Sequence, residues 1–120
     1  MDRSTPWRRA NMDAAFTDDM RAHVLRAVAA STRLADAMAE FELPQEVAYG
    51  RARWDAEFRD ALYSALMDGR DPRLRHGSWT TYDRDGCRCP ECQATQPSCT
   101  GARRWLQEQG LSTPAGQADA

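Results

Sequence analysis

The chain has 120 residues, of which 42% are hydrophobic and 28% are charged. These proportions are typical of a soluble globular protein with one modest core, and no apolar run is long enough to cross a membrane. The N-terminus lacks the apolar core of a signal peptide, so we expect a cytoplasmic protein. A net charge of −2 gives the chain no overall attraction to nucleic acid.

Residues 1–10 are predicted to form a flexible N-terminal arm, and residues 11–68 an antiparallel helical hairpin. Apolar residues recur at three- and four-residue spacing from Asn11 to Phe41, which predicts the first helix. Asn11 or Thr17 could cap its start, and the acidic residues after Thr17 suit the positive end of a helix.

The second predicted helix runs from Pro44 to Met67, because proline suits the first helical position. Gly69 and Pro72 mark its end. The short link between the two helices predicts that they pack side by side, and their exposed face is a candidate homodimer interface.

All four cysteines lie in one stretch that His76 opens. Cys89-Pro-Glu-Cys92 is a knuckle whose turn directs backbone N–H groups at the sulfurs and brings both sulfurs to one side. Cys87 lies two residues before Cys89, so it faces the same way on an extended backbone and can join the same tetrahedral metal site.

His76 is the favoured fourth ligand, and Cys99 is the alternative. Residues 79–82 are rich in strand formers and residues 83–86 form a turn that ends in glycine, so we expect a β-hairpin that returns His76 beside Cys87. Mixed His and Cys ligation favours Zn²⁺. An iron–sulfur cluster, or no metal, remains an open alternative, whereas two disulfides at this spacing would be strained.

The zinc-binding module is predicted to span residues 69–110. It ends in a short helix from Gly101 to Gln109, capped by Thr100 and stopped by Gly110, and a disordered tail follows at residues 111–120. The predicted fold is therefore mainly α, with a small zinc-bound β-hairpin and knuckle between the helical hairpin and the last helix.

Arginine is concentrated around the cysteines, although every basic residue of this chain is arginine and the count alone is weak evidence. Trp79 and Tyr82 lie among these arginines and could stack on bases or sugars. The candidate nucleic-acid-binding residues are Arg70, Arg73, Arg75, Arg84, Arg88, Arg103 and Arg104.

The stretch from residue 76 to 94 resembles a motif of small, mostly uncharacterised proteins of actinobacteria and their phages. That motif is His-Gly-Thr, a Tyr, then Gly-Cys-Arg-Cys-x-x-Cys-x-Ala. The matching residues are His76, Gly77, Tyr82, Gly86, Cys87, Arg88, Cys89, Cys92 and Ala94. Ser78 replaces the Thr. The resemblance implies that His76 and the first three cysteines hold zinc, that Cys99 is an extra thiol, and that the setting is a bacterial host and its phages.

No enzyme is expected, because four protein ligands leave no open metal position and no nucleophilic triad or phosphate loop is present. The first hypothesis is a zinc-stabilised binding module of phage or mobile-element type that contacts DNA or the transcription machinery through its arginines. The second is a protein-only binder that inhibits or redirects a host protein through the helical face. An iron–sulfur or redox sensor is a third. A continuous arginine face would favour DNA, and pairing of the arginines with nearby acids would favour a protein partner.

Overall fold

A computed structural model describes residues 10–11 and 13–111. Most of the predicted arm and of the predicted tail therefore lies outside the described residues. The described part is mainly helical, as predicted, and contains no strand. None of its helices combines the length and the apolar character that a bilayer span requires.

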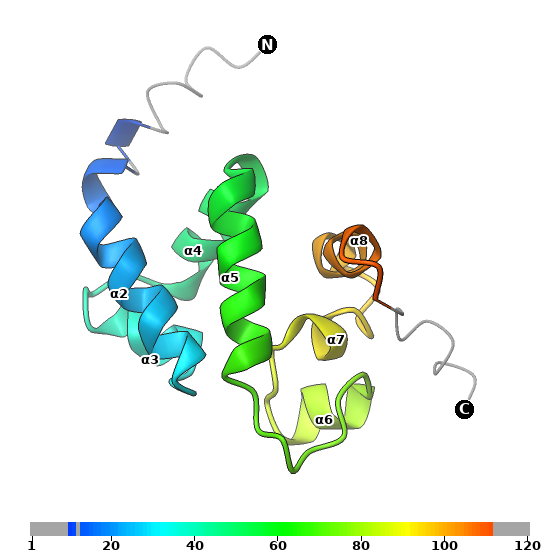
Figure 1. The fold of residues 1–120 in the computed structure, drawn as a ribbon. Helices are drawn as coiled ribbons and strands as arrows, with labels where there is room; N and C mark the ends of the chain where they lie inside the picture. Colours follow the sequence, from blue (N-terminus) through cyan, green and yellow to red (C-terminus); the bar gives the residue numbers. More distant parts are fainter. Residues whose placement is uncertain (1–9, 12, 112–120) are drawn as a thin grey trace.

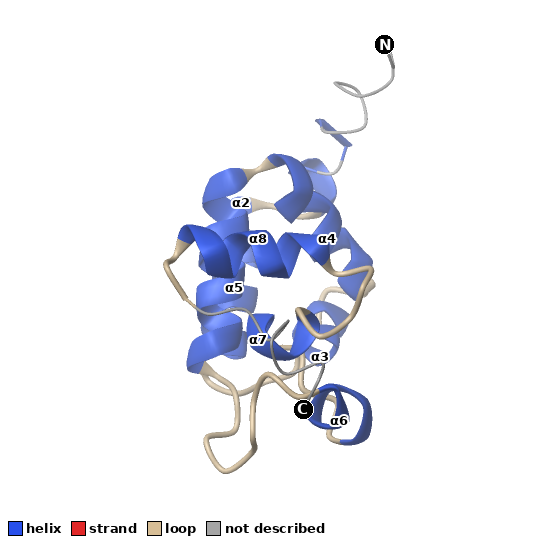
Figure 2. Cartoon of the chain, turned by 90° about the vertical axis from the view of Figure 1, so that its right-hand side faces the viewer, coloured by secondary structure: helices blue, strands red, loops and turns tan. Residues whose placement is uncertain are grey.

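The central helix is α5, against which α2 and α4 pack from one side and α7 and α8 from the other (Figure 1). Figure 2, seen from the α8 side, shows α8 in front of α5. The helices are α2 (Asp18–Ala29), α3 (Leu34–Ala39), α4 (Gln45–Trp54), α5 (Ala56–Asp68), α6 (Trp79–Arg84), α7 (Pro90–Gln93) and α8 (Thr100–Glu108).

One hydrophobic core is formed by side chains of α2, α3, α4, α5 and α8. Phe16 and Phe58 meet edge to face with ring centroids 5.7 Å apart. The most deeply buried apolar side chains of this core are Phe16, Val24, Val28, Ala37, Met38, Ala48, Leu62, Ala102 and Leu106. The apolar stripes predicted from the sequence therefore do form the core.

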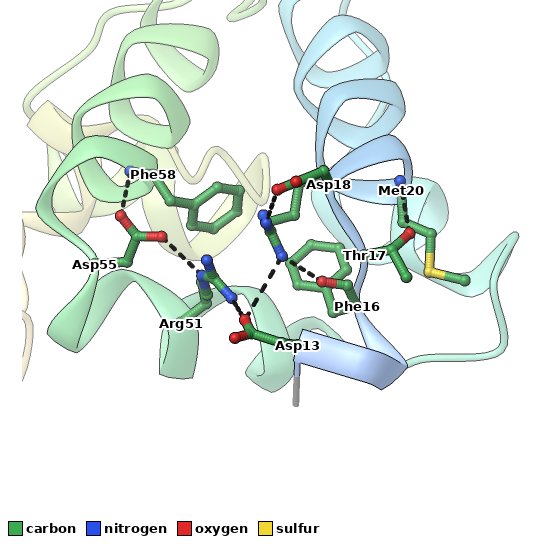
Figure 3. Close-up of polar contacts among 9 residues, drawn as sticks. Asp13, Phe16, Thr17, Asp18, Met20, Arg51, Asp55 and Phe58 are labelled. Carbon is green, nitrogen blue, oxygen red and sulfur yellow. Dashed lines mark hydrogen bonds and ion pairs between the residues drawn. The ribbon is translucent and has the colours of Figure 1, made fainter. Parts of the chain in front are cut away.

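Each of the two predicted long helices is interrupted in the structure. Within the first, residues 13–15 are helical and α2 starts anew at the predicted cap Thr17, which accepts a hydrogen bond from the Met20 N–H at 3.3 Å (Figure 3). Helix α2 breaks after Ala29, because Ser31 adopts a left-handed φ of 82°. The N–H of Thr32 then bonds the carbonyl of Ala27 at 2.9 Å, which closes the helix end.

The second predicted helix breaks at Asp55, whose extended backbone separates α4 from α5. The Asp55 carboxylate accepts the N–H of Phe58 at 3.0 Å and the Nε of Arg51 at 2.8 Å. Arg51 also pairs with Asp13, so one guanidinium links the segment before α2 to this helix junction (Figure 3). A capping aspartate thus starts a new helix where the apolar periodicity predicted a continuous one.

Replacing Asp55 by alanine is expected to lower the free energy of unfolding by about 1 kcal/mol at neutral pH. Burial of Asp55 opposes its ionisation, but the Phe58 N–H and the Arg51 guanidinium outweigh burial and lower the pKa of the carboxyl. Its charge therefore stabilises the fold above the unfolded pKa of about 3.9, and this contribution is lost as the pH falls through the folded value. Urea unfolding at several pH values measures the free energy of unfolding and its dependence on pH. Asp55→Asn should keep the cap and lose the pH dependence; an Asp55→Ala protein as stable as the parent would contradict the assignment.

The predicted β-hairpin is wrong, because residues 79–84 form the helix α6. Ser78 caps this helix by accepting the N–H of Thr80 at 3.2 Å, and the buried Thr81 hydroxyl donates to the carbonyl of Arg75. Gly86 ends it with a φ of 70°. A two-stranded hairpin is marginal alone, whereas this short helix is held by its Ser78 cap and by the hydrogen bond from Thr81 to the Arg75 carbonyl, and these contacts override the strand preference of the Trp, Thr and Tyr side chains.

The predicted C-terminal helix is confirmed as α8, with Cys99 rather than Thr100 at the capping position. Trp105 and Leu106 are buried, and the indole N–H of Trp105 donates to Asp60 at 2.8 Å. Gly110 ends the helix with a φ of 74°, as its position in the sequence predicted. This helix packs on α7, which carries part of the cysteine cluster.

Candidate metal centre

Four side chains that could bind one metal ion lie together: His76, Cys87, Cys89 and Cys92, with all four ligand atoms within 4.8 Å of one another. The Nδ1 atom of His76 is 3.3 Å from the Cys87 sulfur, 3.6 Å from that of Cys89 and 3.5 Å from that of Cys92. Tetrahedral zinc, with bonds of about 2.3 Å to sulfur and about 2.0 Å to nitrogen, separates these atoms by about 3.5 Å. The residues therefore fit one tetrahedral ion.

The knuckle positions the sulfurs through its backbone, as the spacing predicted. Cys89 precedes α7, Pro90 opens that helix and Cys92 lies within it. The N–H of Cys92 bonds the Cys89 sulfur, and the N–H of Cys89 bonds the Cys87 sulfur. The N–H of Gly77 bonds the Cys92 sulfur, which joins the knuckle to the residue beside His76.

His76 is held by its second ring nitrogen. Nε2 lies 2.7 Å from the carbonyl oxygen of Asp71, so it carries the proton and donates it. Nδ1 is then the unprotonated atom, and its lone pair faces the three sulfurs. A carbonyl that fixes the tautomer of a ligating histidine is a common feature of zinc sites. The chain still returns His76 to Cys87, but through α6 instead of a hairpin.

Arg70 lies directly behind the sulfurs. Its Nη1 is 3.6 Å from the Cys89 sulfur, and the same guanidinium pairs with Glu91. Hydrogen bonds from the Cys87 and Cys92 thiols, with a further one from Arg70, lower the pKa of Cys89. Three thiolates around one divalent cation leave an excess negative charge, which this guanidinium is placed to balance.

Replacing Arg70 by alanine is expected to weaken zinc binding roughly 10- to 100-fold, because partners behind the ligands tune affinity by this amount. A competition titration with a chromogenic zinc chelator measures the change. Arg73→Ala is the matched control, since Arg73 is 87% exposed and pairs with Asp71. If Arg70→Ala and the parent bind zinc with equal affinity, Arg70 does not support the metal site.

Cys99, the alternative ligand, is not part of this cluster. It is half-buried at the position that precedes α8. Arg70 and the Asp71 carbonyl were missed as supporting groups, because the spacing of ligands along the chain carries no signal for contacts behind them.

Four of the seven candidate nucleic-acid-binding arginines have partners within the protein. Arg70 pairs with Glu91, and Arg73 pairs with Asp71 at 3.0 Å. The Arg88 guanidinium lies over the Tyr82 ring, 3.7 Å from its centroid. Arg103 donates to three carbonyls before α8, those of residues 94, 96 and 97.

The remaining three, Arg75, Arg84 and Arg104, are exposed and form no ion pair with any described residue. Trp79, at the start of α6, is 62% exposed. Arg84 is the last residue of α6 and Arg75 precedes that helix in the sequence, whereas Arg104 belongs to α8. The structure thus divides the arginines into four that have a partner within the protein, of which Arg73 and Arg88 are still exposed, and three exposed ones without an ion pair to a described residue.

This arrangement can hold one divalent cation with four protein ligands of three different segments. It thereby ties residue 76 to the loop before α7 and to α7 itself.

No family model matches the chain, and no curated protein or solved structure shows significant similarity to it.

Proposed function

We propose that the protein is a non-enzymatic binding module whose C-terminal half is held together by one zinc ion. The single observation that supports this most is the near-equal distance of the His76 Nδ1 from three sulfurs, 3.3 to 3.6 Å. Ligand atoms this close suit one ion rather than a cluster of several irons.

The proposed zinc is structural, because four protein ligands complete a tetrahedron and leave no position for a water or a substrate. Cys89 and Cys92 are almost fully buried, at 2% and 0% exposure, which suits a site that orders the chain. Two contacts further support a structural role. The Asp71 carbonyl holds the His76 imidazole, and the Arg70 guanidinium lies beside the Cys89 sulfur.

We propose nucleic acid as the partner, contacted around α6. Arg75 and Arg84 supply exposed guanidiniums that form no ion pair within the described part of the chain, Trp79 supplies an exposed ring, and Arg88 supplies a cation stacked on Tyr82. Such a combination of basic groups and aromatic faces suits a nucleic-acid backbone and its bases. The motif resemblance supports a phage or mobile-element setting in an actinobacterial host.

The salt dependence of DNA binding tests this proposal. If only Arg75, Arg84 and Arg88 contact phosphates, the logarithm of the affinity should fall with the logarithm of salt with a slope of about −3, and not the slope of about −6 that all seven arginines would give. Arg75→Ala with Arg84→Ala should reduce the slope, and Arg73→Ala should not. Absence of any salt-dependent binding would reject DNA as the partner.

The second candidate is a protein partner bound through the helical face. The pairing of Arg70 and Arg73 with acids favours it, because these arginines need no external anion. A host protein that stays bound at high salt, together with no DNA binding, would support this candidate.

A further inference from the structure

The surface around α6 carries the most exposed aromatic ring of the described residues. Trp79 is 62% exposed, more than the other large apolar side chains at the surface, Trp54 and Leu111. Tryptophan is enriched at binding surfaces, because its ring buries a large area at a low cost in side-chain freedom. A partner for this ring must offer a flat apolar face.

A second ring and a guanidinium follow Trp79 along the same side of α6. Trp79 and Tyr82 are three residues apart in the helix, so their side chains are neighbours on its surface. The Arg88 guanidinium lies over the Tyr82 ring, 3.7 Å from its centroid, and donates to the Tyr82 carbonyl at 2.8 Å. Proteins that bind unpaired nucleic-acid strands stack successive bases on flat groups of this kind.

Hydrogen bonds hold this surface in one arrangement. Ser78 caps α6, and the Thr81 hydroxyl donates to the carbonyl of Arg75, so the backbone of Arg75 lies against the helix. The N–H of Cys87 bonds the carbonyl of Thr81 at 3.2 Å, which ties the end of α6 to the metal centre. A surface that is already ordered loses little freedom when a partner binds.

Exposed arginines border the two rings. Arg75 and Arg84 form no ion pair with a described residue. Tyr82 and Arg88 also line a cleft of about 600 Å³, and Arg104 of α8 lines the same cleft. The cleft therefore continues the surface around α6 toward the third arginine that lacks an ion pair. Its volume is in the range of small-molecule sites, which suits a single unpaired base and not a base pair within a duplex.

The charge of this surface suits one strand better than two. Asp83 and Asp85 are exposed beside the arginines of α6, and Glu46 and Glu108 line the cleft. These acids offset much of the positive charge, so attraction to phosphate alone is weak. The bases of a duplex cover one another's faces, whereas an unpaired strand can stack its bases on the protein. Each stacked base strengthens binding by roughly 5- to 150-fold.

We infer that the surface around α6 binds single-stranded DNA. One base stacks on the Trp79 ring, and phosphates on either side of it contact Arg75 and Arg84. The cleft beyond Arg88 takes the strand toward Arg104. This inference rests on the proposed nucleic-acid binding and names the form of the nucleic acid.

Fluorescence anisotropy of a labelled oligothymidine of about ten nucleotides, titrated with the zinc-loaded protein, tests the inference. The single strand should bind at least about tenfold more tightly than a duplex of the same length, because only the strand offers base faces. Trp79→Ala should weaken binding of the strand about tenfold and leave its salt dependence unchanged, because an indole carries no charge. Arg84→Ala should instead reduce the salt slope by about 0.7.

Two further variants separate stacking from a loss of structure. Trp79→Phe keeps a ring and should keep most of the affinity, whereas Trp79→Leu keeps an apolar side chain without a ring and should bind like Trp79→Ala. Trp54→Ala is the matched control, since Trp54 is an exposed tryptophan of α4 that does not line the cleft. It should bind like the parent.

Equal or tighter binding of the duplex would overturn the inference and leave nucleic-acid binding standing. Unchanged binding in Trp79→Ala, or equal losses in Trp79→Phe and Trp79→Leu, would show that no base stacks on this ring. Tighter binding of oligouridine than of oligothymidine would assign the surface to RNA and reject DNA. Binding of neither strand nor duplex would reject this inference and the proposed nucleic-acid partner together.

Discussion

Replacing Cys92 by serine is expected to release zinc and to unfold the C-terminal part of the protein. Cys92 is fully buried, and its sulfur is 3.5 Å from the histidine nitrogen of the site. A structural zinc site contributes on the order of 10 kcal/mol of apparent binding free energy at neutral pH, which exceeds the stability of many small domains. A serine hydroxyl is a poor zinc ligand, so little of that energy would remain.

Metal content by mass spectrometry and helicity by circular dichroism measure this loss. We expect α6, α7 and α8 to lose helicity, because α7 packs on both α6 and α8. Cys99→Ser is the matched control: it replaces a half-buried thiol outside the cluster and should keep stoichiometric zinc. A Cys92→Ser protein with full zinc and full stability would show that the ligand set is wrong.

Replacing Gly69 by alanine should destabilise the fold by about 1 to 3 kcal/mol, the usual cost of overpacking. Gly69 ends α5, and a side chain there would lie 1.9 Å from the carbonyl oxygen of Val28. The next contacts are also backbone atoms, 3.0 Å away in Val28 and 3.1 Å away in Ser31. Because backbone atoms cannot rotate aside, the end of α2 would have to move away from the end of α5.

Gly50→Ala is the informative control, because nothing lies within 4 Å of the added methyl group. Gly50 is inside α4, so this change should stabilise the protein by about 1 kcal/mol. Urea unfolding of both variants should therefore give changes of opposite sign. A stabilised Gly69→Ala protein would contradict the close approach of α5 to α2.

The cysteines were predictable because their geometry is local. A turn of a few residues sets the positions of Cys87, Cys89 and Cys92, and the close spacing of these cysteines in the sequence predicts that turn. His76 was predicted at the correct position for the wrong reason. A hairpin and a short helix both reverse the chain, and only the Ser78 cap and the buried Thr81 distinguish them.

The helix breaks were missed because residues other than glycine form them. Ser31 breaks the first predicted helix with a positive φ of 82°, which a sequence signals clearly only when glycine is present, and Asp55 breaks the second with an extended backbone. Gly69 was predicted as a helix stop, and the helix does end there. Its φ of −91° is ordinary, and the residue is small because α2 passes close by. That approach, like the pairing of Arg70 with Glu91, depends on tertiary packing.

The most direct test of the central claim is X-ray absorption at the zinc edge, on protein purified without chelators. The account predicts one zinc per chain with three sulfur ligands at about 2.3 Å and one nitrogen ligand at about 2.0 Å. Such a spectrum would establish the closed site formed by His76 and the three clustered cysteines. Four sulfur ligands, an oxygen ligand, or iron in place of zinc would contradict it.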